Sequence, residues 1–143
     1  MKQFNFHLST TFYIFANLEY VRDMEQWQID FEWLRIQHLV KDAMGRTTVP
    51  DFQTVLFLVG VQELGRLTEE KFTKEEKADL MHVAVCTLLE PEGYYTFAGR
   101  DQDGWPHWNV DKPFDTKGPE AQESILKVRL IDYFGKSDGE EKN

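Results

Sequence analysis

The side chains best able to do chemistry lie close together in residues 92–110. This stretch contains one imidazole, His107, and two carboxylates, Asp101 and Asp103. A histidine that hydrogen-bonds to a carboxylate can act as a general acid or base, so these residues predict an acid–base pair. The stretch has no evident nucleophile, and no catalytic residue is assigned from it.

Aromatic side chains are dense in the same stretch, and two of them, Trp105 and Trp108, flank His107. Alternation along a strand would place Trp105 and His107 on one face, with Pro106 and Trp108 on the other. One indole can then pack on the protein while the other remains available to a ligand. The predicted binding residues are Tyr94, Tyr95, Asp101, Asp103, Trp105, His107 and Trp108.

Residues 94–110 have the pattern of a small β-hairpin. Two aromatic runs, 94–97 and 105–110, flank a polar segment that ends in Asp103 and Gly104. An Asp-Gly pair can supply the positive φ angles of a tight hairpin turn. We therefore expect helices on both sides of one short antiparallel pair of strands.

Three interpretations of this hairpin are open. All its rings could anchor it to the helices, which would leave no binding surface. It could instead dock a protein partner, and the acidic surface would then favour a basic one. The third interpretation is a small-molecule-binding protein or enzyme with a site around His107 and Asp101 or Asp103. We expect the second, a non-enzymatic protein–protein interaction module, and keep the third as its alternative.

The sequence contains no complete cofactor-binding or metal-binding motif. The chain has no nucleophile elbow, phosphate loop, HExxH pair or dinucleotide fingerprint, so no cofactor is predicted. Residues 101–104 begin like a calcium loop, but Gly104 is fourth and Lys112 twelfth, where an EF-hand needs glycine sixth and glutamate twelfth. His82 and Cys86 are one helical turn apart, as in a zinc site or Cys–His pair, but no further ligands lie nearby. Packing is the expected role of that pair.

Composition excludes several partners. The 143 residues carry a formal charge of -9 and a pI near 4.9, so nucleic acid and anionic membranes are not expected partners. Cys86 is the single cysteine, which rules out a disulfide within the chain and fits a reducing compartment. Residues 1–9 match a secretion signal poorly, so none is expected, and the apolar run 55–61 is too short to span a bilayer. We expect a cytoplasmic protein.

The elements that must position the hairpin are mostly helical. We expect a mainly α fold, a single-domain bundle of four or five helices over residues 1–135, with 136–143 a disordered polar tail. Residues 4–20 fit either a strand or a helix, and a helix over about 10–26 is preferred. The next helix is predicted to begin after a cap at Asp30 and to end at Gly45.

Three further helices follow from their end signals. Residues 48–51, with a hydroxyl cap and an early proline, suggest the start of a largely buried helix that includes 55–61 and ends at Gly65. A capping box, Thr73 with Glu76, begins the next helix, which ends near Pro91 and Gly93. The last is predicted to run from Pro119 to Phe134, with Gly135 as its stop.

Three segments of the second half carry a family resemblance. These are residues 72–77, 93–95 and 101–108. In that order they resemble a small family of uncharacterised bacterial proteins of similar length. The resemblance implies a bacterial, cytoplasmic setting and brings no activity, cofactor or catalytic residue with it.

Overall fold

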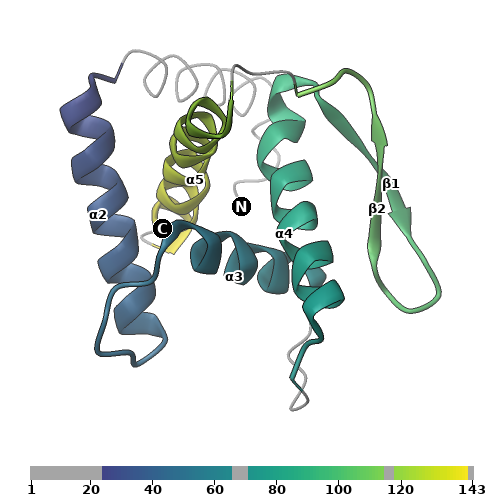
Figure 1. Cartoon of the computed structure of the whole chain (residues 1–143), viewed down its shortest axis with the longest axis horizontal. Helices are drawn as coiled ribbons and strands as arrows, with labels where there is room; N and C mark the ends of the chain where they lie inside the picture. Colours follow the sequence, from purple (N-terminus) through teal and green to yellow (C-terminus); the bar gives the residue numbers. More distant parts are fainter. Residues whose placement is uncertain (1–23, 66–70, 115–117, 142–143) are drawn as a thin grey trace. The chain divides into compact units, whose positions relative to one another are not determined.

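The computed structural model describes residues 24–65, 71–114 and 118–141, which form four α-helices and one two-stranded antiparallel hairpin (Figure 1). The mainly α fold with a single hairpin is therefore confirmed. The predicted helix over 10–26, and the choice between strand and helix for 4–20, fall almost wholly outside these residues. In chain order the elements are α2 (Gln26–Ala43), α3 (Phe52–Leu64), α4 (Lys74–Leu89), the 3₁₀ turn η1 (Glu90–Glu92), β1 (Tyr95–Arg100), β2 (Pro106–Val110) and α5 (Pro119–Glu141).

Contacts within the chain define two compact units. Of the residues that the structure describes, one unit comprises 24–36 together with 127–141, and the other comprises those between Gln37 and Leu126. The second unit contains α3, α4 and the hairpin, and it holds every residue predicted to bind a ligand. The single domain over 1–135 stays a prediction.

Helix α3 supplies much of the core of the second unit. Its residues are apolar nearly all round, as predicted, and the buried ones are Val55, Leu56, Val59, Gly60, Val61 and Leu64. It packs directly on α4 (Figure 1). At the point of closest approach, a Cβ placed on Gly60 would overlap the backbone carbonyl of Leu80. Gly60 therefore lets the two backbones meet without an intervening side chain.

The ends of α3 and α4 follow from their sequence signals, with one correction. The N-cap of α3 is Asp51, whose carboxylate accepts a hydrogen bond from the Thr54 amide at 2.8 Å. The helix thus has its cap at the last of the predicted residues 48–51, and the predicted hydroxyl cap is wrong. Gly65 ends α3 in the left-handed conformation, as predicted. The capping box is confirmed, because Thr73 Oγ1 accepts from the Glu76 amide and Glu76 Oε1 accepts from the Thr73 amide.

The hairpin pairs Tyr95 with Val110 at one end and Arg100 with Pro106 at the other. The register shifts between Phe97 and Gly99, which is a β-bulge. The connection between the strands has five residues, 101–105, and among these only Gly104 has a positive φ angle. The predicted Asp-Gly turn with two positive φ angles is therefore wrong, although the hairpin itself is confirmed.

Two predicted helix boundaries are wrong. Asp30 caps no helix, because it lies inside α2, which starts at Gln26, and its carboxylate accepts from the Gln26 side chain at 2.9 Å. Gly135 does not end α5, which continues to Glu141. A glycine stops a helix by taking a positive φ angle, and Gly135 is not among the described glycines that do so. The predicted start of the polar tail, at residue 136, thus lies within a helix.

The first unit has its own buried contacts. Trp33 and Ile36 of α2 are buried, as are Leu130 and Ile131 of α5. The ammonium group of Lys127 lies 5.3 Å from the centre of the Trp33 ring, within the range of a cation–π contact. Among the helices that the structure describes, in either unit, none is sufficiently long and apolar to span a membrane.

Candidate functional site

A cleft of about 470 Å³ lies between α4 and the hairpin. This volume is within the range of clefts that bind small molecules or single side chains. Its lining residues are Glu76, Asp79, His82 and Val83 from α4, and Asp101, Trp105, Pro106, His107 and Trp108 from the hairpin. Four of the seven predicted binding residues, Asp101, Trp105, His107 and Trp108, thus share one concave surface.

The α4 side of the cleft is built by helical spacing. Glu76, Asp79 and Val83 are three and four residues apart, so they lie on one face of the helix. Val83 is buried, whereas Asp79 is exposed and Glu76 is half-buried next to its partner Thr73. This face thus combines an apolar patch with two carboxylates.

The loop residue Asp101 organises the opposite side. One carboxylate oxygen accepts hydrogen bonds from the amides of Asp103 and Trp105, both at 2.9 Å. The other oxygen lies 2.9 Å from Nε2 of His107, which confirms the predicted pairing of the imidazole with a carboxylate. These contacts, with the His107 hydrogen bond foremost, lower the pKa of the Asp101 carboxyl below its usual value.

The lowered pKa predicts a pH-dependent loop. Asp101 stabilises the loop fully above the ordinary carboxyl pKa of about 4, and this stabilisation is lost as the pH falls through the lowered pKa. The Asp101→Asn variant should therefore be less stable than the wild type at pH 7, and the difference should shrink as the pH falls to about 3. Urea unfolding at both pH values measures this difference. Asp103→Asn is the control, since the Asp103 carboxylate makes none of these hydrogen bonds, and an equal pH effect there would contradict the assignment.

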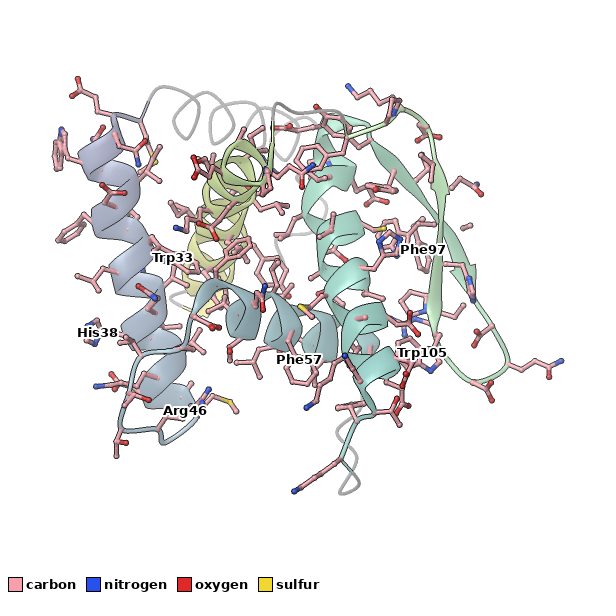
Figure 2. The ribbon with its side chains drawn as sticks, viewed as in Figure 1. Trp33, His38, Arg46, Phe57, Phe97 and Trp105 are labelled. Atoms are coloured by element: carbon pink, nitrogen blue, oxygen red, sulfur yellow. The ribbon has the colours of Figure 1, made fainter. Side chains whose placement is uncertain are left out.

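Trp105 anchors the hairpin to the helices. It precedes β2 and packs against Val61, Leu64 and Leu80, the buried cluster between α3 and α4 (Figure 2). His107, in contrast, is exposed, with a side-chain exposure of 62%. Trp105 lies in the loop before β2, so strand alternation does not describe its position relative to His107, although both residues line the cleft.

Trp108 and Phe97 form the aromatic pair of the hairpin. They are cross-strand partners, and their rings meet edge to face with centroids 5.3 Å apart. Phe97 remains 46% exposed, and Trp108 is half-buried. The indole Nε1 of Trp108 is buried and lacks a hydrogen-bond partner, the only such side-chain atom in the described ranges. The outward-facing rings that the binding hypothesis requires are thus present in part.

The two tyrosines and Asp103 do not line the cleft. The Tyr94 ring meets Phe114 at 5.3 Å, and the ammonium of Lys112 lies 4.4 Å from its centre. Tyr95 stands edge-on to His82 at 6.1 Å, and burial raises the pKa of its phenol. Asp103 is exposed in the loop. These three predicted binding residues therefore lie outside the cleft lining, although Asp103 and Tyr95 contact the lining residues Asp101 and His82.

His82 and Cys86 are adjacent, as their spacing predicts, with the Cys86 Sγ 3.5 Å from His82 Nε2. The thiol is buried, and burial raises its pKa to about 11. A raised pKa lowers the fraction of thiolate at neutral pH, which makes Cys86 a weak nucleophile. Across the described part of the chain, no three His, Cys, Asp or Glu residues are placed to hold a metal ion.

Sequence reasoning missed the contribution of α4. Glu76 was recognised only as a capping residue, Asp79 was not considered, and His82 was considered only with Cys86. Their spacing on α4 was visible in the sequence, but nothing in it indicated that the hairpin would cover this face of the helix. No protein family, curated protein or solved structure matches this chain, so the site rests on its own geometry.

Proposed function

We propose that this protein is a non-enzymatic protein–protein interaction module whose cleft between α4 and the hairpin accepts a lysine or arginine side chain of a partner. The observation that carries the proposal is the lining of the cleft. Among the described residues, the lining includes three carboxylates, Glu76, Asp79 and Asp101, and no lysine or arginine. A basic side chain entering such a space would find opposite charge in a partly desolvated setting.

The aromatic residues of the cleft support the same ligand. Two indoles, Trp105 and Trp108, contribute to its lining, and indole is the ring that binds cations best. Beside them, Phe97 and Val110 are exposed apolar side chains of the hairpin, 46% and 67% exposed. They offer a rim on which the apolar residues next to a basic side chain can pack. The protein's net charge of -9 would further steer a basic partner toward it.

A peptide-binding experiment tests this function. Random peptides with lysine or arginine fixed at the centre are compared with peptides that have glutamate there, and tryptophan fluorescence reports binding near Trp105 and Trp108. We expect the basic peptides to bind and the acidic ones not to bind. Asp79→Lys should weaken binding by at least about 10-fold, since it replaces attraction by repulsion within the cleft.

Asp103→Lys is the matched control for this experiment. It makes the same change of charge on the hairpin, but at a residue outside the cleft. If both variants weaken binding equally, the effect is one of overall charge and the cleft is not the site. If basic and acidic peptides bind alike, the proposal fails.

The second candidate function is a small-molecule site or enzyme at the same cleft. The hydrogen bond between His107 and Asp101, at the edge of a space of suitable size, is the observation that favours it. Asp101 occupies Nε2, which leaves Nδ1 as the ring nitrogen that could exchange a proton with a bound molecule. In the part of the chain that the structure describes, no serine, threonine or cysteine lines the cleft, so acid–base chemistry fits it better than covalent catalysis.

The two functions differ in what binds. Arginine amide, lysine amide and short diamines carry the cationic group without a peptide around it. If these bind as tightly as the best peptides, and His107→Gln abolishes their binding, the small-molecule function is favoured. If only peptides bind, the interaction module is favoured. We place the protein in the cytoplasm as part of this proposal, because its single cysteine cannot form a disulfide within the chain.

A further inference from the structure

Helix α2 has two opposite apolar faces, although packing within one chain needs only one. Trp33, Ile36 and Val40 form the buried face. Trp27, Phe31 and Leu34 lie on the other side, with exposures of 65%, 62% and 50%. Figure 2 shows Trp33 and His38 leaving α2 on opposite sides. Three large exposed apolar side chains in a row on one helix indicate a protein interaction surface.

The spacing of the exposed face is that of a coiled-coil seam. Trp27, Phe31, Leu34 and His38 are separated by four, three and four residues, which is the alternation of the a and d positions of a heptad. His38 is exposed and continues the row by one turn. A face of this kind packs against another helix with the same spacing, which is a stricter requirement than hydrophobicity alone.

The charges along α2 select the orientation of that second helix. Glu25, Asp30 and Glu32 lie in or just before its first half. The second half and the residues just beyond it carry three basic residues, Arg35, Lys41 and Arg46, and one acidic residue, Asp42. Within the chain Arg35 pairs with Glu32 at 2.6 Å and Lys41 lies 3.9 Å from Asp42, so a net positive charge remains at this end of α2. When two copies of α2 lie antiparallel, the acidic end of each lies along the basic end of the other. The positive end of each helix dipole then also lies beside the negative end of the other, which is a favourable arrangement.

We propose that α2 is the interface of a homodimer, in which it pairs antiparallel with α2 of a second copy. In an antiparallel coiled coil, a positions face d positions of the partner helix. Phe31 of each copy therefore faces Leu34 of the other, and Trp27 faces His38. The pairing is isologous, so it closes as a dimer and exposes no further apolar face of α2. This surface is on a different element from the proposed peptide-binding cleft.

Sedimentation equilibrium tests the dimer. Over about 1 to 300 µM, the wild-type chain should change from monomer to dimer, as expected for a small interface of one helix per copy. Phe31→Glu and Leu34→Glu should each raise the dissociation constant by at least about 10-fold, because they place a carboxylate in the apolar seam. Val110→Glu is the matched control, since Val110 is equally exposed but lies on β2. Circular dichroism checks that each variant is folded.

Cysteine cross-linking tests the orientation. Copies with Phe31→Cys are mixed with copies with Leu34→Cys, and the native Cys86 interferes little because it is buried. Antiparallel pairing predicts that the mixed disulfide forms faster than either symmetric one, and faster symmetric cross-links would overturn the orientation. A wild-type chain that stays monomeric throughout, or that dimerises unchanged in both glutamate variants, would overturn the interface. Peptide binding by the cleft is measured separately, so failure of either proposal leaves the other standing.

Discussion

Replacing Gly60 with alanine should be among the most damaging single changes in the chain. The added methyl group would overlap the carbonyl carbon and oxygen of Leu80 on the neighbouring helix. These are backbone atoms, so no side-chain rotation can relieve the overlap, and α3 and α4 must move apart. We expect a loss of about 3 kcal/mol or more, which for a chain of this size lowers the melting temperature by about 10 °C.

Gly135→Ala is the matched control for that experiment. Gly135 also lies inside a helix, α5, but a Cβ there meets no other atom within 4 Å. Because alanine favours the helix over glycine, this variant should be more stable than the wild type by about 0.5 to 1 kcal/mol. Thermal and urea unfolding followed by circular dichroism measure both variants. If Gly60→Ala proves as stable as the wild type, the close approach of α3 and α4 is not present in solution.

Removing the Arg100 side chain should detach the hairpin from α3. Its guanidinium donates to the carbonyl of Glu63 at 2.7 Å and to that of Leu64 at 3.1 Å, at the end of α3. It also donates to Gly104 at 2.8 Å, within the hairpin loop. A positive charge at the carboxyl end of a helix also interacts favourably with the helix dipole. We expect Arg100→Ala to lower the free energy of unfolding by about 2 kcal/mol. The loss is smaller than for three buried hydrogen bonds to a charged group, because Arg100 is exposed to solvent.

Hydrogen exchange should resolve where this loss occurs. In Arg100→Ala, the amides of β1 and β2 should exchange faster, while those of the buried part of α3 should change less. Arg100→Lys keeps the charge but lacks the planar fork that reaches several carbonyls together, so it should restore only part of the protection. If the hairpin amides of Arg100→Ala exchange as slowly as those of the wild type, the packing of Trp105 alone is sufficient to hold the hairpin on the helices.

Short sequence motifs predicted the helix ends correctly where a fixed spacing or a required backbone conformation allows few residue types. The capping box at Thr73 and Glu76 has a fixed spacing, and the structure forms both of its hydrogen bonds. Gly65 ends α3 because a left-handed residue is needed there. The predictions at Asp30 and Gly135 were wrong because a residue type alone does not define a helix end. Each has a residue type common at helix ends, but here the Asp30 carboxylate is bonded to Gln26 within α2 and Gly135 lies within the helical run of α5.

The site was predictable only on its hairpin side. Asp101 and His107 were predicted as partners from proximity along the chain, and they lie within hydrogen-bonding distance. The α4 carboxylates, Glu76 and Asp79, come close to Asp101 and His107 only through tertiary packing. That packing depends on the contact of the hairpin with the helices, to which Trp105 contributes. Strand alternation was applied to Trp105, but this residue belongs to the five-residue loop and not to β2, which begins at Pro106.

The contacts of Arg100 also bear on the order of folding. Helices α3 and α4 follow each other along the chain and pack together, so their pairing closes a short loop and can occur early. The bonds from Arg100 join residues 36 and 37 positions apart, and their acceptors are carbonyls that become available only once the last turn of α3 exists. Hairpin docking is therefore expected as a late kinetic step. Changes at Arg100 should then mainly accelerate unfolding and leave the refolding rate nearly unaltered.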